Sequence, residues 1–447
     1  MSPRLLHYSD IEGVYDVPER LARLAGAVRE RRGDDSLVVG TGDDTAPGVL
    51  PLVRKGRQAV EFFEAVRPDA ETFGNHDFDY GLDAIRGIVR DTPQTWVSAN
   101  VRDDGTVFGE AAGVVPSATF AVDGATVGVV GVTDPTTKEM SPRANGLDFA
   151  DPTAAVGREL DSLRDDGADY LVVLSHLGGA DDDLARRFDV DAILGGHVHV
   201  PRVERVAGTL CTRPGPNGER LVEVDLDAGT ATSHPVDDAT PDADLRERFE
   251  RHRAETGLSE VVARVDEPIR RTRDLRRGGE CRIGNFVADA YRWATDADCA
   301  LHNSGGIRDG PSLDGAVTVA DLVSVVPFDE PVATAAVTGE DLRALFGEAY
   351  RAPHGDPNWN AHVSGAEVVY DTDACEVVEL TVGGLPVDDG ATYRLATNAY
   401  LLQAGHEFPT LRPAHRVETH GVQYEVLADY ARAVGVAPEC EGRVVLR

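Results

Sequence analysis

The chain has 447 residues, 42% of them hydrophobic, and carries 77 acidic against 44 basic side chains for a formal net charge of −33. This length exceeds one ordinary core, so we expect two domains and a connector. No apolar run approaches the roughly 20 residues of a membrane helix, and an acidic chain without a basic stripe argues against binding to a membrane or to duplex nucleic acid.

The N-terminal segment leads directly into the first expected strand, Leu5 to Ser9. Residues 1–4 carry neither the charged nor the apolar segment of a secretory signal. The five cysteines are scattered and contain no C-x-x-C pair, which favours free thiols in a reducing compartment. We therefore expect a cytoplasmic protein. The excess of acid is typical of salt-loving organisms and predicts a halophilic, archaeal source; an acidic protein from a mesophile is the alternative.

Strand and helix patterns alternate through the first 200 residues. After the first strand we expect strands over residues 36–39, 70–73, 95–100, 170–175 and 191–194, and helices over residues 18–32, 58–66 and 152–164. Residues 119–127 predict a hairpin through Asp123-Gly124. Short strands follow at 202–206 and 220–227. This rhythm predicts an α/β fold of two mixed sheet layers covered by helices.

A change of composition divides the chain after this region. Residues 230–242 are rich in Thr, Asp and Pro, as domain boundaries often are. Residues 243–255 are dense in charge and predict an exposed connecting helix. A second region begins near Gly257, with a helix expected over residues 285–295. We expect domains at 1–236 and 258–447, with a linker helix in 237–257.

Loops rich in metal ligands follow several of the expected strands. They are Ser9-Asp10-Ile11-Glu12, Gly42-Asp43, Gly74-Asn75-His76-Asp77-Phe78-Asp79, Ser175-His176 and Gly195-Gly196-His197-Val198-His199. An α/β sheet builds its site outside the carboxyl ends of its strands, where such loops meet. We interpret them together as one dinuclear metal centre, although a single histidine taken alone would more often be structural.

The ligands divide between two ions. Two ions in a hydrolase need a bridging carboxylate, terminal ligands on each side and room for water and substrate. Asp43 is the expected bridge. Asp10, Glu12 and His199 would complete one site, and Asn75, His176 and His197 the other. His197 and His199 point the same way in an extended segment and can reach neighbouring ions.

These loops resemble those of the calcineurin-like metallophosphatases, and nearly the whole chain, including Ser98-Ala99-Asn100, resembles the bacterial and animal 5'-nucleotidase family. The resemblance implies a four-layer αββα metallophosphatase domain joined by a helix to a second, α+β domain that binds the nucleoside. It also implies a catalytic dyad, in which His76 faces the phosphoryl oxygens and Asp79 holds the imidazole. Asp77 is expected outside the ligand set.

The first loop departs from the family. Where the family has Asp-x-His, this chain has Asp10-Ile11-Glu12. A carboxylate is a harder ligand than imidazole, so we expect two divalent ions with Mn²⁺ favoured, Zn²⁺, Co²⁺ or Mg²⁺ being the other possibilities. The alternative is that Glu12 does not ligate and one site is weak.

The second region supplies the expected substrate contacts. Asn303-Ser304-Gly305-Gly306-Ile307-Arg308 resembles the family's Asn-Gly-Gly-Gly-Ile-Arg motif, and Ala404-Gly405-His406-Glu407-Phe408 is an altered form of its Gly-Gly-Asp-Gly-Phe loop. The resemblance implies nucleotide binding by Arg277 and Arg308, contact of Asn303 with an edge of the base or ribose, a base sandwiched by Phe328 and Phe408, and Asn100 as a further substrate residue. The altered loop leaves the base preference open, and each phenylalanine could instead be a core residue.

The resemblance implies hydrolysis of nucleotide phosphate esters by metal-activated water, with 5'-nucleoside monophosphates as the expected substrates. A 2',3'-cyclic phosphodiesterase/3'-nucleotidase or a nucleotide-sugar hydrolase is the alternative on the same scaffold. A catalytically weak nucleotide-binding protein is the alternative of another class. The sequence does not predict an oligomeric state.

Overall fold

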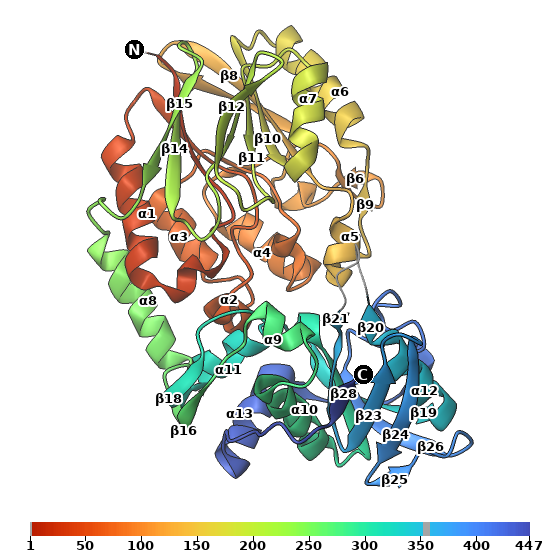
Figure 1. Cartoon of the computed structure of the whole chain (residues 1–447). Coiled ribbons are helices and arrows are strands. Elements are labelled where there is room, and N and C mark those ends of the chain that lie inside the picture. Colours follow the sequence, from red (N-terminus) through yellow and green to blue (C-terminus); the bar gives the residue numbers. More distant parts are fainter. Residues whose placement is uncertain (1, 352–357) are drawn as a thin grey trace. The chain divides into compact units, whose positions relative to one another are not determined.

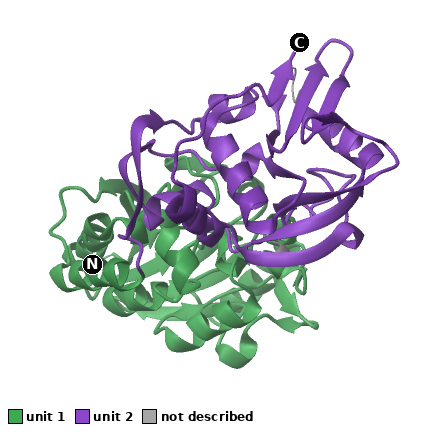
Figure 2. Cartoon of the chain, turned by 90° about the horizontal axis from the view of Figure 1, so that it is seen from below, with its two compact units in different colours: residues 1–256 green, residues 257–447 purple. Residues whose placement is uncertain are grey.

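The computed structural model describes residues 2–351 and 358–447. The chain forms two compact units, residues 1–256 and residues 257–447 (Figure 2).

The first unit contains two six-stranded sheets. The first has the order β15-β14-β1-β2-β3-β4, and β1 to β4 run parallel. Its strands are β1 (Arg4–Tyr8), β2 (Ser36–Gly40), β3 (Ala70–Glu71), β4 (Thr95–Trp96), β14 (Arg220–Asp225) and β15 (Thr230–Pro235). The near-continuous burial of β1 and β2 is what parallel strands covered on both faces require.

The second sheet has the order β12-β13-β11-β10-β8-β7. Its strands are β7 (Ser117–Val122), β8 (Ala125–Thr133), β10 (Tyr170–His176), β11 (Ala192–Gly195), β12 (Arg202–Val206) and β13 (Thr209–Arg213). The expected hairpin joins β7 to β8, with Asp123 and Gly124 at positive φ. Strands β8, β10, β11 and β13 are parallel, so their carboxyl ends share one edge.

The two sheets pack face to face, and helices cover their outer faces. One core joins Leu5 and Val39 of the first sheet to Val172 and Leu194 of the second. In Figure 1, α1 (Pro18–Arg31) and α3 (Ala59–Val66) lie on one side of this sandwich, and α6 (Pro152–Asp165) and α7 (Asp181–Arg187) lie on the other. The predicted four-layer αββα arrangement is confirmed.

Shorter helices in this unit are α2 (Val49–Arg54), α4 (Leu82–Asp91) and α5 (Thr137–Met140). A small three-stranded sheet is formed by β5 (Val101–Asp103), β6 (Thr106–Val107) and β9 (Asp148–Phe149).

The charged segment after the sandwich forms α8 (Ala243–Glu255). Asp242 caps it by accepting a hydrogen bond from the Leu245 amide. The helix is less exposed than we expected, because Leu245 and Phe249 are buried and the Phe249 ring stacks on Tyr15. It therefore packs as part of the first unit.

The second unit is built on a five-stranded mixed sheet of order β22-β17-β26-β19-β27. Its strands are β17 (Cys299–Asn303), β19 (Pro331–Thr338), β22 (Ala361–Ser364), β26 (Thr392–Asn398) and β27 (Arg416–Val422). One face packs on α10 (Arg282–Thr295), α11 (Val319–Val325) and α13 (Gln423–Val434). The other packs on α12 (Gly339–Glu348) and a four-stranded sheet of β23 (Ala366–Asp371), β24 (Glu376–Val382), β25 (Leu385–Pro386) and β28 (Val444–Leu446). The predicted α+β class is confirmed.

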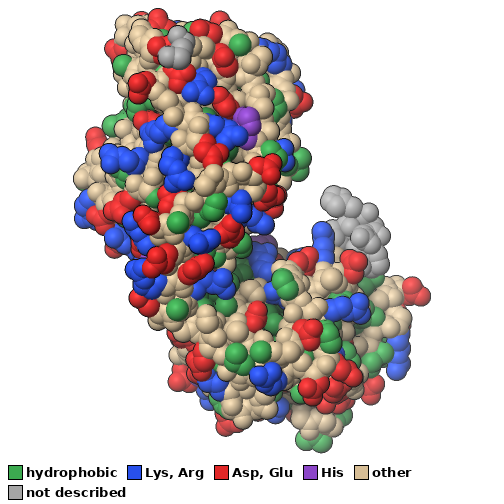
Figure 3. Space-filling model, turned by 90° about the vertical axis from the view of Figure 1, so that its left-hand side faces the viewer, with side chains coloured by type: hydrophobic (Ala, Val, Ile, Leu, Met, Phe, Trp, Pro, Cys, Tyr) green, Lys and Arg blue, Asp and Glu red, His purple; other side chains and the backbone are tan. Residues whose placement is uncertain are grey.

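Short elements complete the second unit. Strand β16 (Val261–Ile269) pairs with β18 (Leu313–Thr318), strand β20 (Tyr350–Arg351) pairs with β21 (Asn358–Trp359), and α9 (Arg273–Arg277) precedes α10. Thr318 and Asp321 form a capping box at the start of α11, and Thr338 and Asp341 form one at α12. Within the described residues, no helix has the length and apolar character needed to cross a membrane. On the face in Figure 3, acidic side chains and those of Lys and Arg are interspersed, and no basic stripe is visible.

Candidate metal centre and substrate residues

The predicted ligand loops all lie at the carboxyl ends of parallel strands. Asp10 and Glu12 follow β1, Asp43 follows β2, and the loop with Asn75 and His76 follows β3. His176 ends β10, and the loop with His197 and His199 follows β11. The first three loops come from one sheet and the last two from the other. The sandwich therefore brings ligands from both sheets to one edge.

Three groups of side chains in this cluster could each hold a metal ion, with their ligand atoms within 4.8 Å of one another. They are Asp43, His176 and His197; Asp10, Glu12 and His199; and Glu12, Asp43 and His76. His176 Nε2 lies 3.0 Å from Asp43 Oδ2, and His199 Nε2 lies 3.0 Å from Glu12 Oε1. The Asn75 side chain joins them, with Oδ1 at 2.9 Å from His197 Nδ1.

The donor atoms fit metal ions better than they fit one another. His176 Nε2 and Glu12 Oε1 are buried, and neither has a hydrogen-bond partner among the described residues despite its close neighbour. Two ligands about 2.1 Å from one ion and at right angles lie about 3 Å apart without a hydrogen bond between them. A set of imidazoles, carboxylates and one amide oxygen also suits divalent first-row ions. The residues present therefore fit the expected dinuclear centre.

The ligand loops hold unusual backbone conformations. Asp10, Glu12, Asp43 and His197 have φ of 50°, 34°, 55° and 70°, a region that non-glycine residues seldom occupy. Such conformations cost about 1–3 kcal/mol each and persist where the surrounding structure imposes them, typically at functional sites.

Glycine allows these loops to approach closely. A Cβ atom on Gly74 would lie 2.2 Å from Asp43 Oδ1. A Cβ on Gly196 would lie 2.4 Å from Ser9 Oγ and 2.8 Å from His176 Nδ1. Neither position has room for a side chain, which explains the glycines beside the ligands.

His176 is oriented for ligation by Nε2. Its Nδ1 lies 2.7 Å from the carbonyl oxygen of Thr41, to which it donates, so that Nε2 points toward Asp43. Burial opposes a charge on this imidazole, but the charges of Asp43 and then Asp10 outweigh it and raise the pKa of His176 to about 10. The same negative field would attract a divalent cation, which would displace the proton.

The pKa values of Asp43 and Asp10 shift in opposite directions. Burial works against a charge on Asp43, yet His176 and His76 beside it lower its pKa to about 2. For Asp10, burial dominates and the pKa rises to about 6, although His176 works against the rise. Of these two carboxylates, Asp43 therefore stays ionised more readily, which suits the expected role of a bridge between two cations.

His76 and Asp79 form a close pair beside the cluster. His76 Nδ1 lies 2.7 Å from Asp79 Oδ2, and the His76 backbone N–H donates to Asp43 Oδ1 at 2.7 Å. Burial disfavours the imidazolium, but Asp79 and then Asp43 raise the pKa of His76 to about 10. The geometry is that of an imidazolium held in one orientation by a carboxylate.

Asp77 organises the loop that carries Asp43, a detail that the sequence did not reveal. Its Oδ2 accepts from the backbone N–H groups of Asp43 and Gly74, and its Oδ1 accepts from those of Asp44 and Thr45. Asp77 therefore stays outside the ligand set, as expected, and holds two ligand loops together.

The side chain of Asn100 is held by the backbone and is not free to contact a substrate. It is fully buried, its Nδ2 donates to the Thr133 carbonyl at 2.7 Å, and its Oδ1 accepts from the Thr133 backbone N–H at 2.9 Å. Because the backbone occupies both ends of the amide, we revise its expected role to positioning the loop after β8.

Arg277 and Asn303 lie near one another in the second unit. A Cβ atom on Gly305 would lie 3.6 Å from Asn303 Nδ2 and 4.0 Å from an Arg277 nitrogen. Partial burial, followed by the charges of Arg273 and Arg276, lowers the pKa of Arg277. A guanidinium in such a cationic setting is suited to an anionic group.

Phe328 and Phe408 differ in their surroundings. Phe328 is half-buried, with the Arg308 guanidinium 4.8 Å from its ring centroid. Phe408 is 0% exposed and belongs to the hydrophobic core, together with Leu401 and Leu411. The prediction that both rings sandwich a base is therefore corrected for Phe408, since its ring is already packed on all sides.

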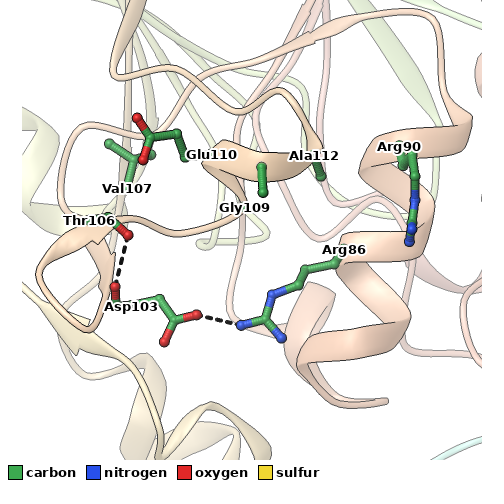
Figure 4. A pocket seen from close by; sticks show the side chains of 9 residues that line it. Arg86, Arg90, Asp103, Thr106, Val107, Gly109, Glu110 and Ala112 are labelled. Atoms are coloured by element: carbon green, nitrogen blue, oxygen red, sulfur yellow. Dashed lines mark hydrogen bonds and ion pairs between the residues drawn. The ribbon is translucent and has the colours of Figure 1, made fainter.

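A separate pocket of about 280 Å³ lies in the first unit (Figure 4). Its lining includes Arg86, Arg90, Asp103 and Glu110, and Arg86 is paired with Asp103. None of the cluster residues lines it. We assign it no part in the chemistry of the metal centre.

Comparison with known proteins matches both units. Residues 3–201 match the family model of the calcineurin-like phosphoesterases, and residues 261–413 match that of the 5'-nucleotidase C-terminal domain. The snake venom 5'-nucleotidase of Crotalus adamanteus is 25% identical, covering 95% of this chain and 83% of its own. The trifunctional nucleotide phosphoesterase YfkN of Bacillus subtilis is 24% identical, covering 98% of this chain and 34% of its own. The crystal structure of a 5'-nucleotidase precursor from Thermus thermophilus superimposes with a TM-score of 0.77 at 25% identity, covering 100% of this chain and 99% of the other. With the ligand cluster at the edge of its sandwich, the chain belongs to the 5'-nucleotidase family of calcineurin-like metallophosphoesterases.

Proposed function

We propose that this metallophosphoesterase hydrolyses 5'-nucleoside monophosphates to nucleoside and phosphate. The observation that carries the proposal is the cluster at the sandwich edge, where two groups of ligand atoms share a neighbourhood with the His76–Asp79 pair. The matches to nucleotidases over nearly the whole chain support the class of substrate.

Asp43 is the proposed bridging ligand. Asp10, Glu12 and His199 are proposed for one ion, and Asn75, His176 and His197 for the other. Two divalent ions bound there would supply Lewis-acid activation of water and of the phosphoryl group. Of the candidate ions we favour Mn²⁺, because the Asp10 group holds two hard carboxylates and a single imidazole.

His76 is the proposed catalytic cation. Asp79 and Asp43 favour its protonated form, which would stabilise negative charge that develops on the phosphoryl or leaving oxygen. Asp79 acts on the reaction through His76, because it contacts the imidazole and fixes its orientation.

Arg277, Asn303, Arg308 and Phe328 are the proposed residues for the rest of the nucleotide. Arginines suit anionic groups, the amide suits a polar edge of the base, and a partly exposed ring suits the face of a base. Phe408 is not proposed for stacking, because it lies in the core.

Hydrolysis at other phosphate positions is the second candidate. The relative from Bacillus subtilis carries the description "trifunctional nucleotide phosphoesterase", and the altered residues 404–407 differ from the family's usual loop. A cyclic phosphodiesterase/3'-nucleotidase would use the same metal cluster with a different placement of the sugar.

The test is phosphate release from 5'-mono-, di-, cyclic and sugar nucleotides in high salt, with Mn²⁺, Zn²⁺, Co²⁺ or Mg²⁺ returned after chelation. We expect turnover of 5'-monophosphates that falls by about 10²-fold or more in His76→Ala while the bound metal content is unchanged. Preference for cyclic or 3'-phosphates would favour the second candidate. Binding of nucleotides without turnover under any metal would replace both with a binding protein.

A further inference from the structure

Three buried polar side chains meet at the carboxyl ends of strands β17 and β26. His302 and Asn303 end β17, and Asn398 ends the neighbouring parallel strand β26. Their exposed fractions are 0%, 4% and 3%. The parallel register places the three side chains together, where each polar atom needs a partner.

The backbone fixes which way the Asn398 amide points. The Leu401 backbone N–H, which can only donate, lies 2.9 Å from Asn398 Oδ1. Asn398 Nδ2 is then the donor at the other end, 3.3 Å from His302 Nδ1 and 3.2 Å from Asn303 Oδ1. Its two hydrogens therefore have two acceptors.

His302 is compatible with this assignment. Burial, and then the neighbouring His362, lowers the pKa of His302 to about 3. The imidazole is neutral, so its Nδ1 can accept a hydrogen bond. The orientation of the Asn303 amide thus follows from the Leu401 N–H, which can only donate, through the single side chain of Asn398.

The orientation of Asn398 determines which atom of the Asn303 amide is left to contact a substrate. Its Oδ1 is occupied by Asn398, so the amide presents Nδ2, which lies on the side of Gly305 and Arg277. Among the described residues, no hydrogen-bond partner of Nδ2 is found. If the Asn303 amide turned over, its NH₂ group would meet that of Asn398, and a buried hydrogen bond would be lost.

We propose that Asn398 is a positioning residue that keeps Asn303 a hydrogen-bond donor, so that the site selects nucleotides whose base offers an acceptor, a ring nitrogen with a free lone pair or a carbonyl oxygen, at that edge. The inference rests on the proposed function and adds a rule for its substrates. A ribose hydroxyl would not be selected in this way, because it can both donate and accept.

The experiment compares adenosine 5'-monophosphate with its 1-deaza, 3-deaza and 7-deaza analogues, each of which replaces one acceptor nitrogen by C–H. In the unsubstituted chain we expect one analogue to raise KM about tenfold with little change in kcat.

In Asn398→Asp both carboxylate oxygens accept, so the Asn303 amide turns over and presents its oxygen. The rise in KM for that analogue, relative to adenosine 5'-monophosphate, should then fall to about twofold or less, because the parent nucleotide has lost its hydrogen bond to Asn303 as well.

Gln423→Glu is the matched control, since it also changes a buried amide to an acid, at a side chain bonded to Tyr291. This variant should leave the rise in KM for the deaza analogue unchanged. Asn303→Asp, which presents an oxygen directly, provides a second route if Asn398→Asp does not fold.

Equal KM for all three analogues, or an undiminished rise in KM in Asn398→Asp, overturns the inference. If no nucleotide is hydrolysed, the proposed function fails, but calorimetric binding of the same four nucleotides still tests the donor rule. The two failures are therefore distinguishable.

Discussion

Glu12 Oε1 lies 3.0 Å from His199 Nε2, and the same nitrogen lies 3.7 Å from Asp10 Oδ1. This group therefore offers two carboxylates and one imidazole, where the family's usual loop would offer one carboxylate and two imidazoles. Because harder ligands favour Mn²⁺ over Zn²⁺, we predict that Glu12→His shifts the preference toward Zn²⁺. The measurement is metal content after dialysis against equal Mn²⁺ and Zn²⁺, together with activity in each metal.

Glu110→His provides the control, because Glu110 lines the separate pocket of the first unit and none of the cluster residues does. It should leave both metal content and preference unchanged. Tightly held zinc with full activity in the unsubstituted chain would contradict the role given to Glu12.

The His76–Asp79 pair predicts a pH dependence. Asp79, with Asp43, raises the pKa of His76 to about 10 against the effect of burial. Activity that needs the imidazolium is present below this pKa and is lost as the pH rises through it. Asp79→Asn removes the nearest charge, so we expect the alkaline limb of kcat to move to lower pH and kcat at neutral pH to fall about 10²-fold.

The pH profile separates this role from a structural one. A substitution that only loosened the loop would lower kcat at every pH and leave the alkaline limb in place. Asp83→Asn, at an exposed carboxylate of α4, is a control for the loss of one negative charge. An unmoved limb in Asp79→Asn would overturn the account of His76.

The close approach at Gly196 predicts a loss of metal affinity. A Cβ there would lie 2.4 Å from Ser9 Oγ and 3.0 Å from Asp10 Oδ2, so Gly196→Ala must displace a ligand loop. We expect metal affinity to fall at least tenfold and stability to fall by about 1–3 kcal/mol. The control is Gly179→Ala, since a Cβ there meets nothing within 4 Å. Equal metal affinity in the two variants would show that the loop can yield.

The sequence predicted that the ligand loops lie close together, because each of them directly follows a strand. Strand direction then decides where the loops meet, and the paired registers of β1, β2, β10 and β11 place them at one edge. The candidate ligand residues themselves could be identified directly, since a histidine or carboxylate beside a glycine is visible in the sequence.

The substrate side was predicted less well, because a motif does not show what surrounds a side chain. Asn100 matches the family by position, yet Thr133, distant in sequence, occupies its amide. The role of Asp77 was equally hidden, since its partners are backbone N–H groups of another loop. The cytoplasmic location and the halophilic source stay predictions from composition.

Phe328 and Phe408 differ in burial, so we predict that substitution of Phe328 affects nucleotide binding and that substitution of Phe408 affects stability. Phe328→Leu removes a partly exposed ring that lies under the Arg308 guanidinium, and it should raise KM for nucleotides with little change in unfolding temperature. Phe408→Ala empties a packed core position and should lower the free energy of unfolding by about 3–5 kcal/mol. Phe408→Leu restores most of the volume, so KM in this variant should stay close to that of the unsubstituted chain. Thermal unfolding and nucleotide KM measured on all three separate the roles, and a large rise of KM in Phe408→Leu at unchanged stability would return Phe408 to the base site.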